Sequence, residues 1–305
     1  MGIDAVCVSQ VSGPEMAAAA AIDAMAHAGT RPEQIDLVLH ASTYFQGHDL
    51  WAPASFVRRV SVGQAGLSVD VGQLSNGGMA ALELATSYLH ADPRRHSALV
   101  TTGDRFCAPG FDRWNTDPGT VCGDGGTGLV LSAYDGFARL LALVTISDPE
   151  LEAMGRGEDP FARAALAARR PISLQAHRAG LIQEYGLGAL LQRLQTGQRK
   201  AFDDALSQAC VRLGDVAWFV VPNLGRPKMD QQFFRPLGIS PERTTWERGR
   251  RTGHLGAGDQ IAGLAHLVNT GVLTTGSICV LIGAGGGFAW STAVLEIMRP
   301  PQRTP

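Results

Sequence analysis

The sequence lacks the features that mark several large classes of protein. Its net charge is only −2 over 305 residues, so charge gives no reason to expect binding to nucleic acid or to an anionic membrane. No apolar run reaches the length that spans a membrane. Residues 1–6 have no basic region ahead of an apolar stretch, so we expect no secretory signal and a cytoplasmic location.

Cysteine is scarce. The five cysteines are an odd number, are scattered along the chain and form no C-x-x-C pair, which is unlike the spacing of zinc sites and of disulfide frameworks. We therefore expect no metal site and a reducing compartment. Cys107 and Cys122 lie on either side of a loop and are candidate reactive thiols, but buried structural cysteines are commoner.

Apolar residues and glycine are abundant. The hydrophobic fraction is 45%, and many of the 37 glycines fall at the ends of expected strands, a pattern that favours a layered α/β protein. The expected helices span 14–29, 54–60, 79–89, 201–213 and 260–268, and the expected strands span 37–43, 69–71, 96–104, 129–132, 140–146, 214–222 and 277–283. Residues 151–200 are more charged and predict connector or cap helices between an N-terminal half, 1–150, and a C-terminal half, 201–305.

The two halves repeat the same order of elements. A helix followed by 34–39 matches a helix followed by 215–221, the turn 73–78 matches the turn 254–259, and 98–103 matches 279–283. This repeat predicts two α/β units related by a pseudo-two-fold axis. If the units pack symmetrically, the two turns face each other, and Ser75 and His254 meet where the halves join.

Ser75 stands where a short apolar strand becomes a helix. Leu82, Leu84 and Leu89 predict that this helix is largely buried. A hydroxyl at the start of a helix lies beside unpaired backbone N–H groups and the positive end of the helix dipole, which suits a nucleophile whose attack creates an oxyanion. Serine is also a common N-cap, and that interpretation stays open.

Five motifs occur together in one order and at one set of spacings. They are Asp70-Val-Gly-Gln-Leu-Ser75-Asn-Gly, Gly123-Asp-Gly-Gly-Thr-Gly128, Val221-Pro-Asn223, Gly253-His254-Leu-Gly-Ala-Gly-Asp259 and Gly283-Ala-Gly-Gly-Gly-Phe-Ala-Trp290. In combination they resemble the ketoacyl-acyl-carrier-protein synthase III branch of the thiolase superfamily, over nearly the whole chain. The resemblance implies a thiolase-like αβαβα sandwich of five layers and two pseudo-equivalent halves. It also implies a homodimer that uses acyl-coenzyme A or acyl carrier protein as substrate and holds no permanently bound cofactor.

The family usually carries a longer N-terminal segment, so the resemblance leaves the first strand and the coenzyme A entrance open. The catalytic positions differ as well: Ser75 replaces the family's nucleophilic cysteine, Asn223 its first catalytic histidine, and His254 its asparagine. A serine hydroxyl needs a base within hydrogen-bond reach, and His254 with Asp259 behind it would supply one. This combination resembles the serine-containing priming proteins and acyltransferases of aromatic polyketide (daunorubicin-type) pathways. The family pattern adds the backbone N–H of Gly286 as an oxyanion donor.

Each of these residues has a simpler structural interpretation. His254 could be a polar core residue, Asp259 a carboxylate that favours the helix dipole, and Asn223 the residue that ends a strand. Trp51 is expected to pack within its loop. In the resembled family the matching loop lines the partner subunit's acyl pocket, so Trp51 is also a candidate for setting acyl length by filling that pocket.

The residues and the resemblance together predict an acyltransferase. An acyl group, expected to be short, passes to Ser75 and then to a carrier protein or a small-molecule acceptor in polyketide or natural-product biosynthesis. Asn223 keeps a donor amide but no imidazolium, so the family's decarboxylative condensation is expected to be weakened. Two alternatives stay open: a starter-unit condensing ketosynthase that still forms the carbon–carbon bond, and a catalytically silent partner subunit of a synthase.

Overall fold

The computed structural model describes residues 1–164 and 170–300. Its helices are α1 Gly13–Ala28, α2 Pro53–Ser61, α3 Gly77–His90, α4 Leu174–Tyr185, α5 Leu187–Gln208, α6 Arg226–Met229, α7 Arg235–Leu237, α8 Trp246–Gly249 and α9 Asp259–Thr270. Its strands are β1 Ile35–Ala41, β2 Leu67–Val71, β3 Ser97–Asp104, β4 Gly125–Ser132, β5 Ala138–Ser147, β6 Val216–Val220, β7 Ile278–Gly285 and β8 Ala289–Ile297. Two single 3-10 turns, η2 Leu74–Asn76 and η7 Gly256–Gly258, lead into α3 and α9.

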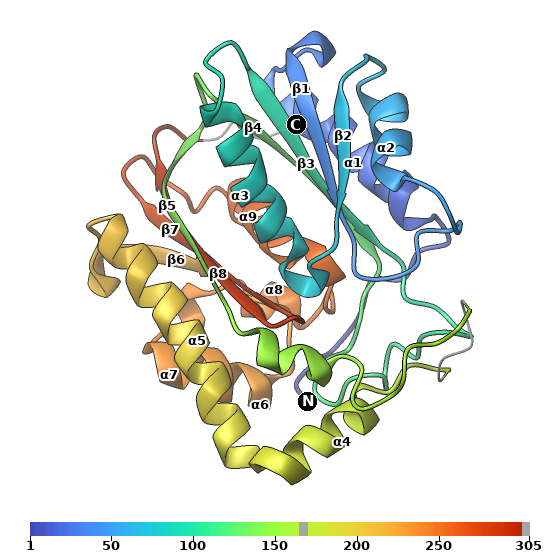
Figure 1. The fold of residues 1–305 in the computed structure, drawn as a ribbon. Coiled ribbons are helices and arrows are strands. Elements are labelled where there is room, and N and C mark those ends of the chain that lie inside the picture. Colours follow the sequence, from blue (N-terminus) through green and yellow to red (C-terminus); the bar gives the residue numbers. More distant parts are fainter. Residues whose placement is uncertain (165–169, 301–305) are drawn as a thin grey trace.

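Helices and sheets alternate in five layers (Figure 1). One sheet has the strand order β2-β1-β3-β4 and the other the order β5-β8-β7-β6. Helices α3 and α9 lie between the sheets, α1 and α2 pack on the outer face of the first sheet, and α5 packs on the outer face of the second. The predicted αβαβα sandwich is confirmed.

The two sheets are built alike. In the first, β1 pairs parallel with β3, and β3 pairs antiparallel with β4. In the second, β6 pairs parallel with β7, and β7 pairs antiparallel with β8. The segments matched by the sequence repeat therefore occupy equivalent positions, and the turns that begin α3 and α9 come together between the sheets.

Two predicted boundaries differ from the structure. The sequence assigns 140–146 to the first half, but β5 pairs with β8 in the second sheet, so the chain crosses over between β4 and β5, ahead of residue 150. The helix predicted from 201 is the C-terminal part of α5. A buried stripe through Leu190, Leu194 and Ala201 continues across the predicted connector, and Gly197 within it is needed because a Cβ there would clash with the Trp290 ring.

Helix α3 is buried on the sides that face the two sheets. Its buried side chains include Met79, Leu82 and Leu89. The prediction for Leu84 is wrong, since this side chain is 52% exposed. A helix between two sheets still leaves one stripe free, and Leu84 lies on that stripe with Ser87, three residues further along.

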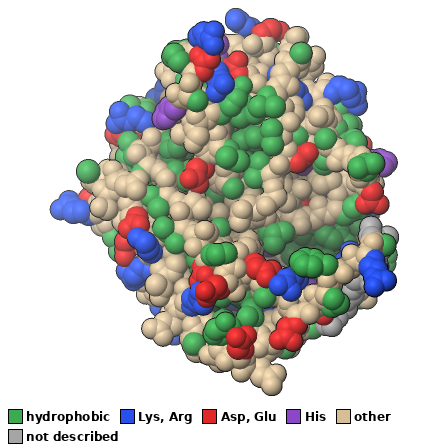
Figure 2. All heavy atoms as spheres, viewed as in Figure 1, with side chains coloured by type: hydrophobic (Ala, Val, Ile, Leu, Met, Phe, Trp, Pro, Cys, Tyr) green, Lys and Arg blue, Asp and Glu red, His purple; other side chains and the backbone are tan. Residues whose placement is uncertain are grey.

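Strand β2 is an outer strand of the first sheet, and its side chains are unusually apolar for an exposed edge. Leu67 and Val69 are 49% and 39% exposed, and Leu74 just beyond the strand is 42% exposed. Figure 2 shows apolar side chains gathered on this face of the molecule, over β2 and α3.

None of the helices within the described residues is long and apolar enough to cross a membrane.

Candidate active site

Ser75 lies in the tight turn η2 between β2 and α3. The turn is sharp because Leu74 adopts a positive φ of 46°, a conformation that costs a non-glycine residue about 1 kcal/mol or more. The Ser75 hydroxyl forms a 2.7 Å hydrogen bond with Nε2 of His254. The N-cap position of α3 is Asn76, so the structure does not support the N-cap interpretation of Ser75.

His254 comes from the equivalent turn of the other half, as the repeat predicts. Its backbone is held by the loop ahead of β4: His254 N–H donates to the Val121 carbonyl at 2.8 Å, and Gly123 N–H donates to the His254 carbonyl at 2.9 Å. The Nδ1 atom lies 2.6 Å from Asp259 Oδ2. Because a carboxylate only accepts, Nδ1 carries the proton, and Nε2 is left to accept the hydrogen of Ser75.

Asp259 begins α9 and is 1% exposed. Besides the His254 ring, its carboxylate accepts the backbone N–H of Asn223 at Oδ2 and that of Leu255 at Oδ1, both at 2.8 Å. These bonds leave the carboxylate one orientation. Ser75, His254 and Asp259 thus form a continuous hydrogen-bonded chain across the join between the two halves.

The electrostatics of His254 follow from this arrangement. Burial lowers the pKa of the imidazole, but the charge and hydrogen bond of Asp259, together with the charges of Asp117 and Asp104, raise it by more. The net pKa of His254 therefore lies above its ordinary value of 6.5. A more basic imidazole is a stronger proton acceptor, provided that it is neutral at the working pH.

The β7–β8 turn approaches η2 closely. A Cβ on Gly285 would clash with the backbone of Asn76, and one on Gly286 would lie 2.5 Å from the Leu74 side chain. Gln73 Nε2 lies 3.4 Å from the Gly286 carbonyl. Glycine is therefore required at position 285, where the two backbones meet, and the role of Gly286 as an oxyanion donor stays a prediction.

The other two predicted residues have clear structural partners. Asn223 is 3% exposed, and its side-chain Nδ2 donates to the Gly253 carbonyl at 2.9 Å. Trp51 is 39% exposed, and its ring contacts are with His48 and Phe56, in its own loop and in α2. These contacts match the loop-packing interpretation of Trp51; its role in an acyl pocket stays a prediction.

Sequence reasoning missed Asp104, at the end of β3. Its fully buried carboxylate accepts backbone N–H bonds from Thr43, Tyr44 and Ala257. Burial raises the pKa of Asp104 to about 7, against the lowering effect of these bonds. Since Ala257 lies in η7, this carboxylate helps to hold the turn between His254 and Asp259. An acidic residue ending an otherwise uncharged strand was the available signal.

The Gly123–Asp124–Gly125 motif has a structural role. Asp124 is buried and pairs with Arg113 at 3.0 Å, which fixes the loop that holds His254.

All five cysteines are free. Burial, together with the nearby acidic side chains, raises the pKa of Cys122 far above its usual range, so this thiol is a poor nucleophile. Cys107 is exposed.

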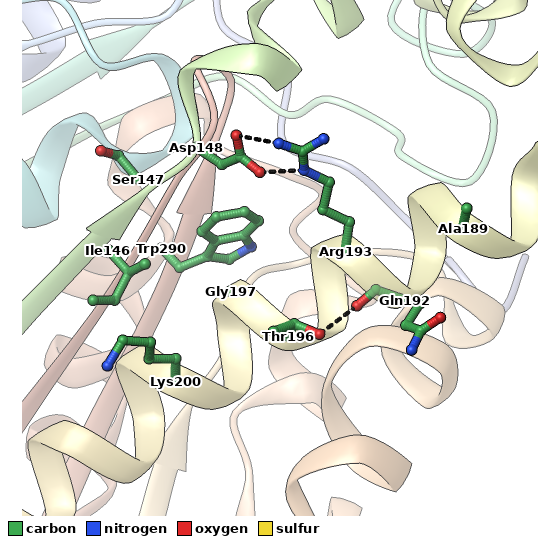
Figure 3. A pocket seen from close by; sticks show the side chains of 10 residues that line it. All are labelled: Ile146, Ser147, Asp148, Ala189, Gln192, Arg193, Thr196, Gly197, Lys200 and Trp290. Carbon is green, nitrogen blue, oxygen red and sulfur yellow. Dashed lines mark hydrogen bonds and ion pairs between the residues drawn. The ribbon is translucent and has the colours of Figure 1, made fainter. Parts of the chain in front are cut away.

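A separate hollow of about 420 Å³ lies between α5 and the ends of β5 and β8 (Figure 3). In the figure the Arg193 guanidinium reaches Asp148, and the Trp290 ring lies beside Gly197 of α5. The side chain of Ser291, the residue after Trp290, bonds to Asn76 beside α3. Because successive strand residues face opposite ways, the hollow lies on the other face of the sheet from Ser75.

Comparison with known proteins places the chain in a family. Residues 206–297 match the family model of the 3-oxoacyl-[acyl-carrier-protein] synthase III C-terminal region. The β-ketoacyl-[acyl-carrier-protein] synthase III of Rhodospirillum centenum is 25% identical over 285 residues, or 92% of this chain and 83% of that protein. The solved structure of ChlB3, described as an acyltransferase, is 38% identical with a TM-score of 0.88, over 97% of this chain and 87% of ChlB3.

The chain belongs to the ketoacyl-acyl-carrier-protein synthase III-like family of the thiolase superfamily. The 3-oxoacyl-(acyl carrier protein) synthase III of Pseudomonas aeruginosa PAO1, at 22% identity, shares the fold with a TM-score of 0.75, over 98% of this chain and 86% of that chain. The family model covers the segment that carries Asn223, His254 and Asp259, whereas Ser75 lies outside it. The synthase III-like fold thus accounts for the meeting of the two turns.

Proposed function

We propose that this synthase III-like protein is an acyltransferase that carries the acyl group on Ser75. The observation that supports it is the hydrogen-bonded chain from the Ser75 hydroxyl through His254 to Asp259. A serine in place of a thiol is useful only if a base activates it, and this site has both the base and the carboxylate that orients it. The 38% identity to ChlB3 favours the same class of reaction.

In the proposed first step, Ser75 Oγ attacks the carbonyl carbon of a thioester while His254 Nε2 takes the hydroxyl proton. The oxyanion forms against the backbone N–H groups of Ser75 and Gly286, where losing one such donor costs on the order of 3 kcal/mol in the barrier. Collapse breaks the carbon–sulfur bond, and the departing thiolate takes the proton from His254. The products are the Ser75 ester and a free thiol.

The second step reverses these roles. An acceptor hydroxyl, amine or thiol gives its proton to His254 and attacks the Ser75 ester, whose oxygen recovers the proton on leaving. The proposed donors are acyl-coenzyme A and acyl carrier protein, with short acyl groups preferred and with a setting in polyketide or natural-product biosynthesis.

A condensing synthase is the second candidate, because the relative from Rhodospirillum centenum is named as one. Against it, position 223 carries no imidazole, and one of the two N–H groups of the Asn223 amide is engaged with the Gly253 carbonyl, which leaves a single neutral donor for a malonyl thioester oxygen. Product analysis with malonyl-carrier protein separates the two candidates. Transfer without carbon–carbon bond formation is expected, and a β-keto product would contradict the transferase proposal.

We also propose a homodimer formed through the β2 edge. The apolar side chains Leu67, Val69 and Leu84 are exposed, and Figure 2 shows apolar side chains gathered over β2 and α3. An edge strand with such side chains is prone to pair with another chain. Light scattering should give twice the mass of one chain. A Leu67→Lys/Val69→Lys variant should give a single chain, and a wild-type monomer at micromolar concentration would contradict the proposal.

The direct test of the transferase proposal is a panel of acyl-coenzyme A donors. Each donor is incubated with the protein, and released thiol and protein mass are followed together. Equal amounts of free coenzyme A and acylated protein are expected for the preferred donor. No mass gain with any coenzyme A or carrier-protein donor, on correctly folded protein, would favour the silent-subunit interpretation instead.

A further inference from the structure

Asn223 forms hydrogen bonds to Asp259 and to the peptide that precedes His254. It follows Pro222 beyond the end of β6 and is 3% exposed. Its backbone N–H donates to Asp259 Oδ2 at 2.8 Å, and its side-chain Nδ2 donates to the Gly253 carbonyl at 2.9 Å. One residue therefore holds both the carboxylate and the peptide that leads into His254.

The peptide between Gly253 and His254 is tightly enclosed. Because it leads directly into His254, any displacement of this peptide also displaces the imidazole. Gly253 has a φ of +80°, and a Cβ on it would lie 2.8 Å from the Val6 side chain. On its other side the segment is fixed through the His254 N–H, which donates to the Val121 carbonyl at 2.8 Å. The Asn223 amide adds a hydrogen bond to the Gly253 carbonyl from the segment that follows β6. The backbone that carries the imidazole is therefore held on both sides.

The Asn223 side chain also fits its surroundings closely. A Cβ on Gly249 would clash with Asn223 Oδ1, so the amide lies directly against the backbone of α8. A leucine of similar size would leave the Gly253 carbonyl without this donor. An aspartate would direct a second carboxylate toward that carbonyl and close to Asp259. Asparagine supplies both the shape and the hydrogen that this position needs.

We propose that Asn223 is a positioning residue, which braces the His254–Asp259 pair against the end of β6 and does not donate to the substrate oxyanion. The proposal rests on the proposed function, because Asn223 acts here through His254. A brace matters only while the base is present, whereas an oxyanion donor acts on the substrate directly. The two roles therefore differ in how they depend on His254.

A double-mutant cycle separates these roles. Asn223→Leu should slow Ser75 acylation by about 10- to 100-fold, the range expected for a lost buried hydrogen bond, with unchanged affinity for the acyl donor. In a His254→Ala background the same change should slow the residual acylation by less than about threefold, because the base that it braces is gone. A further loss of about tenfold or more in that background would overturn the proposal.

Gln260→Leu is the matched control. Gln260 is 2% exposed, adjoins Asp259 and also donates a side-chain amide to a backbone carbonyl, that of Ile282 at 2.9 Å. This variant should acylate within about threefold of wild type. If Asn223→Leu does not fold, as judged by thermal unfolding, the smaller Asn223→Ser takes its place in the cycle.

A second readout needs no substrate and so separates failure of the brace from failure of the proposed function. The titration of His254 is followed by NMR of its ring protons. Asn223→Leu should lower the midpoint, because the peptide that leads into His254 loses its hydrogen bond from residue 223, and a displaced imidazole is less well placed for Asp259 to offset its burial. An unchanged midpoint would contradict the brace even if the wild type accepts no acyl group, whereas a lowered midpoint without wild-type acylation would count against the proposed function alone.

Discussion

Replacing Asp259 by asparagine isolates the electrostatic contribution to the proposed base. The carboxylate bonds to His254 Nδ1 at 2.6 Å and to the backbone N–H groups of Asn223 and Leu255 at 2.8 Å. An amide has nearly the same shape, so the turn should persist. It carries no charge to stabilise the imidazolium, and its NH₂ group can face Nδ1 and favour the wrong tautomer.

The size of the effect can be worked out from this geometry. Opposite unit charges centred about 4 Å apart interact by about 4 kcal/mol at an effective dielectric constant of about 20. Each 1.36 kcal/mol is about a tenfold change in rate, so loss of the charge alone slows acylation by about 10³-fold. The wrong tautomer adds to this, and we expect a total of roughly 10³- to 10⁴-fold.

The assay is acylation at saturating acyl-coenzyme A, quenched at set times and read as intact-protein mass. Asp36→Asn is the control, because Asp36 also accepts two backbone N–H bonds, from His96 and Ser97. It lies at the N-terminal end of β1 and has no part in the proposed site. Equal thermal midpoints would show that both variants fold. If Asp259→Asn stays within about tenfold of wild type, Asp259 does not act as the orienting carboxylate.

Three further outcomes follow from the same geometry. The acylation rate should rise with pH through a midpoint above 6.5, because only neutral His254 takes the Ser75 proton and Asp259 raises its pKa; a rate constant flat from about pH 5 to 8 would contradict this. Ser75→Cys should still be acylated when His254 is changed to alanine, because a thiol ionises near neutral pH without a base; mass spectrometry of that double variant checks it, and an unmodified protein would mean that residue 75 does not face the donor. Asp104 has its pKa raised from 3.8 to about 7, so its contribution to stability is complete below about pH 4 and is lost as the pH rises through 7. Relative to Asp104→Asn, the free energy of unfolding of the wild type should therefore fall by up to about 4 kcal/mol between about pH 4 and 7, as measured in urea; parallel curves for the two proteins would refute it.

The repeat in the sequence was enough to predict two related α/β units and the meeting of Ser75 with His254, and the family resemblance implied their arrangement in five layers. Each half places a glycine-rich turn at the start of a buried helix, and symmetry then brings the two turns together. Burial within α3 was harder to predict. Leu82 and Leu84 are both leucines in the same apolar helix, but packing between the two sheets leaves one side of the helix exposed, and Leu84 lies on that side.

Contacts between segments far apart in sequence could not be predicted. β5 was assigned to the wrong half because the sequence of an apolar strand does not indicate which sheet it joins. Only its pairing with β8 decides this. The bonds of Asp104 to Thr43 and Ala257 and of Asn223 to Gly253 likewise join residues that no local pattern connects. Both place buried polar groups around the turn that carries His254.

A single oxygen atom, Ser75 Oγ, decides the proposed chemistry, and its acylation can be observed directly. The wild type and Ser75→Ala are incubated with the preferred acyl-coenzyme A, digested and mapped by peptide mass. The wild type should carry one acyl group, on the peptide that contains Ser75, and Ser75→Ala should carry none. An acyl group found on Cys107, or retained in full by Ser75→Ala, would contradict the assignment of Ser75 as nucleophile.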